Sequence, residues 1–269
     1  FEHIEGNISA LKGVKYVITI DSDTKLSIET AKKLIGTIIH PLNKAVVDDK
    51  KGIVTEGYGL LQPRISVDIV SANASRFAWI FAGQGGIDIY TNAVSDIYQD
   101  YFGEGIFTGK GIYELEVFQG ILRNMIPENS VLSHDLIEGA HVRTGLVTDI
   151  ELIDGYPSSY SSFSMRLHRW TRGDWQLIQW LFSKVRNAKG EIVRNPLSAI
   201  NRWKILDNMR RSLVPPSEVL LFLLSLWLFP GNAMVWLLFT IIAAVFPLFV
   251  SFAEAVVIKY NQKINEESG

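Results

Sequence analysis

Apolar and polar positions follow two different spacings along the first part of the chain. Lys15–Ile20 is a nearly continuous apolar run, which is typical of a strand covered on both faces. Ser27–His40 has apolar residues at helical spacing and is ended by Pro41. Strand-like stretches and helical patterns continue to alternate: strands over Tyr58–Ile65 and Gly145–Leu152, and helices over Ala74–Ala82, His134–Arg143 and Ser159–Val185. This alternation predicts an α/β domain over residues 1–197 with a mainly parallel sheet.

The pattern changes toward the C-terminus. Two apolar runs, Val219–Phe229 and Ala233–Ile258, contain a single charged residue, Glu254, and are separated by a Pro-Gly-Asn sequence. About 20 apolar residues suffice to cross a bilayer, so we expect a transmembrane hairpin over residues 218–260. Basic residues on both flanks predict that both ends lie in the cytoplasm. The alternative is one span together with a buried or interfacial helix.

Residues 198–217, between these two parts, mix basic side chains with apolar ones. Within this range, Asn201–Leu213 carries the apolar residues Trp203, Ile205, Leu206, Met209 and Leu213 among several basic ones. This mixture predicts an amphipathic helix at the membrane surface. At the other end, Phe1 is not a methionine, and a nucleotide site would need another βαβ unit before the first strand. We therefore expect that the α/β domain lacks its N-terminal part.

Composition narrows the classes of function. Hydrophobic residues make up 48 % of the chain and mean hydropathy is slightly positive, which fits a membrane-associated part. The 26 basic and 28 acidic residues give a net charge of −2, so there is no electrostatic support for a nucleic-acid partner. Because there is no cysteine, disulfides, thiolate metal sites and cysteine nucleophiles are excluded.

The first candidate chemistry follows the first strand, at Asp21-Ser22-Asp23. Two carboxylates at this spacing can hold Mg²⁺ or Mn²⁺ together with a bound diphosphate, because these cations favour carboxylate oxygens and share their coordination with phosphates. The alternative is a solvated turn that caps a helix. The preceding strand favours the metal site.

A second candidate is the acidic start of a helix in Ser133–Gly139. A carboxylate there could act as general base toward a sugar hydroxyl, and Asp135 and Glu138 share one helical face, so the residues leave the choice between them open. The alternative is that Ser133 caps the helix and the acids only stabilise its first turn.

Two further stretches could contact phosphate or sugar. In Arg166–Trp175, Arg169 could clamp a pyrophosphate and Trp170 could stack on a sugar ring, unless the stretch is an aromatic-basic helix facing lipid headgroups. In Gly103–Tyr113, glycines allow close backbone approach and Lys110 offers a cation, although a simple glycine-rich turn would explain the pattern equally well.

Taken in chain order, five motifs resemble those of processive glycosyltransferases of the GT-A fold, such as cellulose and hyaluronan synthases: Asp21-Ser-Asp23, Gln62-Pro63, Phe107-Thr-Gly-Lys-Gly111, His134-Asp135 and Arg166-x-x-Arg169-Trp170. Three stretches are similar to signatures of a narrower group, the glycosyltransferase domain of cyclic β-1,2-glucan synthases: Ser133–Gly139, Arg169–Gln176 and Asp207–Leu213.

This resemblance implies roles for individual residues. Asp21 and Asp23 match the pair that holds the metal and the UDP diphosphate, and Asp135 matches the general base. Arg169 and Trp170 match the motif that closes over the diphosphate and the acceptor sugar. The other residues expected to bind substrate are Gln62, Thr108, Gly109, Lys110, Glu138 and Arg166, the last standing where the family has glutamine.

The resemblance also implies an activity. It is inverting transfer of glucose from UDP-glucose to a growing β-1,2-glucan, with Mg²⁺ or Mn²⁺ as cofactor. The enzyme would be a multi-pass protein of the bacterial inner membrane, with its catalytic domain in the cytoplasm. The alternatives are a β-1,3- or β-1,4-glycan synthase and a non-catalytic membrane scaffold.

Overall fold

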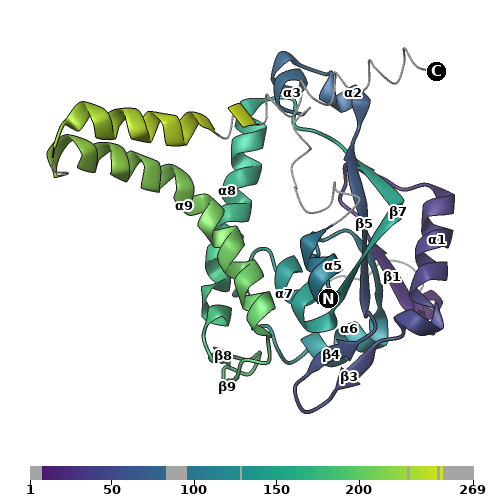
Figure 1. Ribbon diagram of the computed structural model, residues 1–269. Helices are drawn as coiled ribbons and strands as arrows, with labels where there is room; N and C mark the ends of the chain where they lie inside the picture. Colours follow the sequence, from purple (N-terminus) through teal and green to yellow (C-terminus); the bar gives the residue numbers. More distant parts are fainter. Residues whose placement is uncertain (1–7, 83–95, 128, 229–230, 247–248, 251–269) are drawn as a thin grey trace. The chain divides into compact units, whose positions relative to one another are not determined.

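The structure is a computed structural model that describes residues 8–82, 96–127, 129–228, 231–246 and 249–250 (Figure 1). The chain divides into two compact units, Phe1–Asp207 and Asn208–Gly269, and the boundary falls within helix α9 (Ala199–Trp227). The predicted division at residues 197 and 217 stays a prediction.

The first unit is built on a five-stranded sheet with the strand order β1-β6-β5-β7-β2. Its strands are β1 (Tyr16–Thr19), β2 (Thr24–Lys25), β5 (Leu60–Val67), β6 (Gly111–Glu114) and β7 (Thr144–Asp154). Two hairpins lie outside this sheet, β3 (Val46–Asp48) with β4 (Ile53–Glu56) and β8 (Lys184–Arg186) with β9 (Ile192–Arg194). The described helices of this unit are α1 (Ile28–Ile38), α2 (Ile69–Ala72), α3 (Arg76–Phe81), α5 (Ile97–Phe102), α6 (Leu115–Leu122), α7 (Asp135–Val142) and α8 (Tyr160–Gln176), with the 3₁₀ helices η1 (Ile8–Leu11), η2 (Pro41–Asn43) and η3 (Leu177–Leu181).

The mixed α/β class is confirmed, but the prediction of a mainly parallel sheet is wrong. Only β5 and β7 pair in parallel, whereas β1–β6, β5–β6 and β2–β7 are antiparallel. The main reason is β6, which enters between β1 and β5 and runs against both, and the two-residue β2 adds an antiparallel pairing with β7. With only four residues after a glycine-rich stretch, β6 has no apolar run that would predict a strand. Strand β1 is therefore an edge strand of the described sheet and is half-buried, not covered on both faces as predicted.

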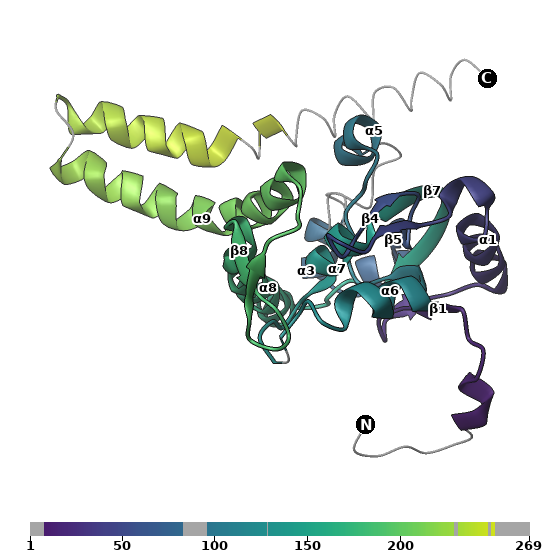
Figure 2. The same cartoon turned by 90° about the horizontal axis from the view of Figure 1, so that it is seen from below.

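Helices cover both faces of the sheet. Leu60 and Leu61 point to opposite faces because they are neighbours in β5. Leu61 packs with Leu34 and Ile38 of α1, while Leu60 packs with Val142 of α7 and with α6. In Figures 1 and 2, α1 accordingly lies to one side of the strands and α7 to the other. Each buried leucine or isoleucine contributes about 1.5–3 kcal/mol of hydrophobic free energy.

Helix α8 is shorter than the predicted Ser159–Val185. It ends at Gln176, and the chain continues through η3 into the β8–β9 hairpin. The side chain of Asn195, just past β9, donates hydrogen bonds to the carbonyls of Trp180 (2.6 Å) and Phe182 (2.8 Å). These bonds fix the backbone where the chain leaves η3. The apolar spacing of a helix does not predict a contact between residues so far apart in the sequence.

The start of α9 packs into the first unit. Ile205 is fully buried, and Lys204 Nζ donates to the carbonyls of Glu104 (3.2 Å) and Gly105 (3.0 Å). Lys204 is therefore buried among peptide carbonyls, while its neighbour Trp203 is half-exposed. Residues 199–217 are helical within α9, but one of the basic side chains expected at a membrane surface lies inside the protein.

The predicted transmembrane hairpin over residues 218–260 is not supported. Within the described parts of the chain, no helix combines the length and the apolar character that a membrane crossing requires. Helix α9 carries Arg210, Arg211 and Glu218 ahead of its apolar turns. Of the second apolar run, residues 233–246 are helical, and its end after residue 250 lies outside the described residues.

Candidate active site

Asp21 and Asp23 lie in the turn between β1 and β2, as the sequence predicts. Thr24 N donates to Asp21 O (3.1 Å), which closes the turn. Both carboxylates face cations: Lys110 Nζ lies 3.1 Å from Asp21 Oδ2, and Arg166 Nη2 lies 3.0 Å from Asp23 Oδ2. A pair of carboxylates is the protein contribution that Mg²⁺ takes when substrate phosphates supply further ligands. The donor set thus fits a divalent cation bound with a diphosphate.

Lys110 connects the acidic turn to a carboxylate that the sequence analysis missed. Its ammonium group is buried against Asp154, whose Oδ1 also accepts a hydrogen bond from Thr24 Oγ1 (2.6 Å). Burial alone would lower the pKa of Lys110, but the hydrogen bond and charge of Asp154, with the charge of Asp21, raise it. Lys110 is therefore a stable cation at the site. Asp154 is the last residue of β7, two residues past the predicted strand Gly145–Leu152, and it precedes Gly155, a position that could have indicated it.

Gln62 is fully buried in β5 and holds the loop that carries Lys110. Its Oε1 accepts hydrogen bonds from Thr108 N (2.9 Å) and Thr108 Oγ1 (3.1 Å), and its Nε2 donates to Pro63 O (2.9 Å). The sequence analysis expected Gln62 to contact substrate. Its hydrogen bonds instead make it a residue that positions Thr108 and the loop behind it.

Replacing Gln62 with alanine should destabilise the protein by about 1–3 kcal/mol, because the partly buried amide and hydroxyl of Thr108 would lose their acceptor. Denaturant unfolding of the variant would measure this loss. Gln119→Ala removes an exposed glutamine of α6 and should leave the free energy of unfolding nearly unchanged. Equal stabilities of the two variants would contradict the positioning role.

The same loop touches the start of α7. Gly109 has φ +88°, and a β-carbon there would lie 3.1 Å from Asp135 Oδ2. The left-handed backbone and the short distance both require glycine. Asp135, Lys110 and Asp21 are thereby brought to one place from three distant parts of the chain.

Asp135 has the properties of a proton acceptor. Burial raises its pKa to about 6, the charges of Glu138 and Asp21 act in the same direction, and the charge of His134 opposes them. At neutral pH a carboxylate with a pKa of about 6 is mostly ionised, and it is a stronger base than an ordinary aspartate. Ser133 does not cap α7: the N-cap is His134, without a side-chain hydrogen bond, and Ser133 Oγ contacts Asp135 Oδ2 at 3.4 Å.

Glu138 is engaged by the neighbouring histidine. His134 Nδ1 lies 2.6 Å from Glu138 Oε1, and this hydrogen bond raises the pKa of His134. Ligand atoms of His134, Asp135 and Glu138 all lie within 4.8 Å of one another. Glu138 is thus paired with His134, whereas the Asp135 carboxylate forms no ion pair among the described residues.

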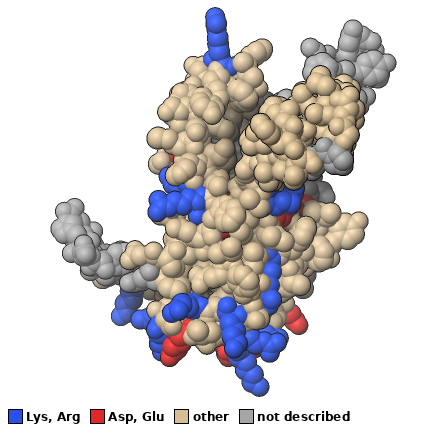
Figure 3. Space-filling view, turned by 90° about the vertical axis from the view of Figure 1, so that its left-hand side faces the viewer, with Lys and Arg blue, Asp and Glu red and all other residues tan. Residues whose placement is uncertain are grey.

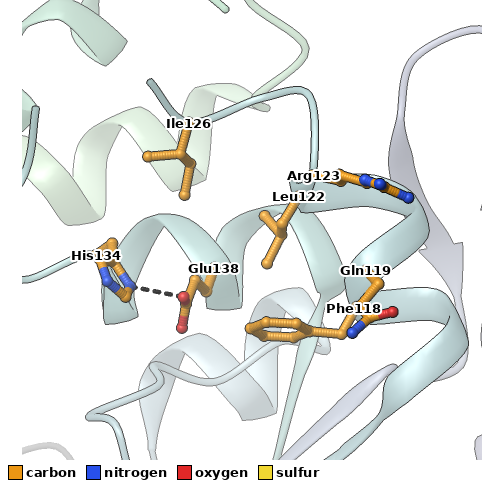
Figure 4. Close-up of a pocket in the computed structure, with 7 residues that line it drawn as sticks. All are labelled: Phe118, Gln119, Leu122, Arg123, Ile126, His134 and Glu138. Carbon is orange, nitrogen blue, oxygen red and sulfur yellow. Dashed lines mark ion pairs between the residues drawn. The ribbon is translucent and has the colours of Figure 1, made fainter. Parts of the chain in front are cut away.

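The His134–Glu138 pair forms the polar end of a cavity of about 540 Å³ between α6 and α7 (Figure 4). Phe118, Leu122 and Ile126 supply its apolar wall, and Gln119 and Arg123 stand at its edge. The ring of Phe118 is stacked on Tyr113, with 4.1 Å between the ring centroids. The cavity therefore places an aromatic side chain beside the His134–Glu138 pair.

Helix α8 reaches both acidic motifs. Arg166 pairs with Asp23, and seven residues later Gly173 is buried against Ser133, whose Cβ would lie 2.8 Å from a β-carbon at residue 173. With a rise of 1.5 Å per residue, these two contacts are about 10 Å apart along the helix. Trp170 lies between them on the same face, half-buried, with the Arg166 guanidinium 6.0 Å from its ring.

Arg169 differs from its neighbours in α8. It is exposed, and in the described part of the chain its side chain has no ion pair or hydrogen bond. The structure thus brings together most of the predicted site residues: Asp21, Asp23, Thr108, Gly109, Lys110, Asp135, Glu138, Arg166 and Trp170. Gln62 supports the site from within the sheet, and Arg169 is left on the surface of α8.

No family model matches the chain. A comparison with curated proteins does find a relative. The chain is 43 % identical over 251 residues to cyclic beta-(1,2)-glucan synthase NdvB of Rhizobium meliloti (strain 1021). The match covers 92 % of this chain and 8 % of that protein, so the chain spans a small part of its relative's length. The resemblance read from the sequence motifs is confirmed.

Proposed function

Because the chain is related over nearly its whole length to a segment of a cyclic β-(1,2)-glucan synthase, we propose that it forms a glucosyltransferase site of the GT-A type that extends a β-1,2-glucan from UDP-glucose. The observation that carries the proposal is the meeting of Asp135 with the Gly109–Lys110 loop, which also contacts Asp21. A proton acceptor and a diphosphate-binding group are both needed for glycosyl transfer, and here they lie side by side.

The proposed mechanism is a single displacement that inverts the anomeric carbon. Asp135 accepts the proton of the acceptor hydroxyl. At the same time the oxygen of that hydroxyl bonds to the anomeric carbon of glucose, and the bond between this carbon and the UDP oxygen breaks. Mg²⁺ or Mn²⁺ held by Asp21 and Asp23 would supply positive charge at the departing diphosphate. Arg169, exposed on α8, would add a cation only by turning toward the diphosphate, whereas Lys110 and Arg166 already stand beside the same carboxylates. Such fixed charges contribute most when they face the charge that develops in the transition state.

Sugar binding is proposed for two aromatic surfaces. Trp170 lies on the same face of α8 as Arg166 and Gly173, which contact Asp23 and Ser133. Its ring can stack on the acceptor sugar. The cavity beside Glu138 offers Phe118 as a second aromatic contact, with the Glu138 carboxylate next to it. An acceptor glucan whose end reaches Asp135 has room for its next units there.

The proposal is tested by giving the intact protein radiolabelled UDP-glucose and analysing the linkages of the product. We expect a β-1,2-linked glucan. A β-1,3 or β-1,4 product would assign the site to another processive glycan synthase. Binding of UDP without any transfer would instead favour a non-catalytic scaffold.

The acid limb of the pH–rate profile should report the ionisation of Asp135. With a pKa of about 6, transfer should fall as the pH drops below about 6. Because the charge of Glu138 raises this pKa, Glu138→Gln should move the acid limb to lower pH, whereas Glu116→Gln on the exposed face of α6 should not. Loss of transfer at every pH in Glu138→Gln would assign the base to Glu138.

A membrane location is also proposed, from the flanking basic residues in the sequence and not from the described helices. If residues 214–258 cross the membrane twice, a reporter fused after Lys263 should be cytoplasmic. A reporter that is accessible from the periplasm would mean a single crossing.

A further inference from the structure

The β8–β9 hairpin presents cations that face one another. Lys184 lies directly opposite Arg194, and Arg186 lies opposite Ile192. Side chains of such pairs, and those two residues apart on one strand, share a face of the hairpin. Like charges directly across a ladder destabilise it, so this face carries an electrostatic cost that its own fold does not offset.

Acidic side chains of the described residues do not compensate these cations. Lys184, Arg186, Lys189 and Arg194 are all exposed, and among the described residues none of them has an ion pair. The one carboxylate within residues 183–195, that of Glu191, accepts a hydrogen bond from Asn187 Nδ2 (2.9 Å). At the lower end of Figure 3, where the hairpin lies, Lys and Arg side chains gather, with acidic side chains beside them.

The hairpin is held rigidly although its cationic face is exposed. Val185, on the opposite face, is buried, and Ala188 N donates to Asn124 O (3.1 Å). In the turn, Asn187 Oδ1 accepts from Lys189 N (3.0 Å) and Glu191 N (2.9 Å). These contacts fix the backbone from which the cationic side chains project before any partner binds, which lowers the entropy cost of binding.

Large apolar side chains stand among the cations. Ile192 is 66 % exposed on the cationic face, and Phe182, two residues before Lys184 in extended backbone, is 62 % exposed. A soluble polyanion would use the charges but would leave these side chains in water. The surface of an anionic bilayer uses both, because phosphate headgroups attract the cations and the acyl boundary takes up the apolar groups.

We propose that the face formed by Phe182, Lys184, Arg186, Ile192 and Arg194 binds the anionic phospholipid surface of a membrane. Lys189, at the turn, adds a further cation for the headgroups. The proposal concerns a surface apart from Asp135 and its neighbours, and it holds whether or not the chain transfers glucose. It also does not require a transmembrane helix.

The absence of cysteine from the chain allows a direct test. Ile192→Cys is labelled with an environment-sensitive fluorophore in the full chain, and Leu42→Cys, in the exposed η2, gives a matched probe elsewhere. Vesicles of phosphatidylcholine, with or without phosphatidylglycerol, are then added. We expect a blue shift and increased emission at residue 192 only with the anionic vesicles, reversed by high salt, and no change at residue 42.

Charge variants complete the test. Neutralising Lys184, Arg186, Lys189 and Arg194 to glutamine should weaken the response at residue 192 about fivefold for each charge removed. Neutralising Lys32, Lys33, Lys44 and Lys50 changes the net charge equally and should leave the response intact. An unchanged emission at residue 192 on anionic vesicles, or an equal response to neutral ones, would overturn the proposal. So would an equal loss in both charge variants.

Discussion

Asp135→Asn should lower glucose transfer by about 10²–10⁴-fold, the usual contribution of a general base, while UDP binding persists. Asparagine keeps the size of the side chain and its contact with Gly109 but cannot accept the proton of the acceptor hydroxyl. Glu138 is held by His134 at 2.6 Å and cannot take over without breaking that pair. The measurement compares turnover and UDP affinity in the intact protein.

Stability separates this loss of activity from unfolding. Because the folded-state pKa of Asp135 is raised from the ordinary 3.8 to about 6, the ionised carboxylate destabilises the fold as the pH rises through this interval. The asparagine side chain carries no such charge, so the Asp135→Asn variant should have a higher Tm than the wild type at pH 8 and nearly the same Tm at pH 4. Normal transfer by Asp135→Asn, with Glu138→Gln inactive, would instead assign the proton acceptor to Glu138.

Long periodic elements could be predicted from the sequence, and short or contact-dependent ones could not. Helix α1 and strands β5 and β7 lie where the apolar pattern puts them, because many residues repeat the same spacing. Strand β6 has four residues, and it becomes a strand only because β1 and β5 supply hydrogen-bonding partners on both sides. The wrong prediction of a mainly parallel sheet follows from two short strands that the apolar pattern does not show, β6 and the two-residue β2, because every pairing that they make is antiparallel.

The candidate site shows the same division. Asp21, Asp23 and Asp135 could be predicted as site residues, because their residue types and their spacing in the sequence already indicate the chemistry. Asp154 and Gln62 act through contacts with Lys110 and Thr108, which are 44 and 46 residues away in the sequence. Only the folded arrangement distinguishes a side chain that faces the site from one that holds a loop in place.

Asp23→Ala should reduce transfer by at least about 10²–10³-fold, the effect of losing one preorganised electrostatic contact to a transition state. The remaining Asp21 would have to hold the cation and the diphosphate alone, and Arg166 would lose its carboxylate partner. The fold should survive, because a partly exposed ion pair contributes only about 0–1 kcal/mol. Turnover measured over a range of Mg²⁺ or Mn²⁺ concentrations, together with Tm, tests both statements.

Two controls make this result specific to the metal. Asp48→Ala removes a carboxylate that pairs with Lys51 at 3.2 Å on the β3–β4 hairpin, and it should leave transfer unchanged. Arg166→Gln breaks the same ion pair as Asp23→Ala but keeps both carboxylates, so its dependence on the metal concentration should stay like that of the wild type. If Asp23→Ala kept more than about a tenth of the metal-dependent turnover, a smaller loss than a preorganised contact predicts, Asp23 could not be a ligand on which the reaction depends. If Arg166→Gln instead reproduced the altered metal dependence of Asp23→Ala, the ion pair itself would be the feature that matters, and the function of Asp23 would be to orient α8.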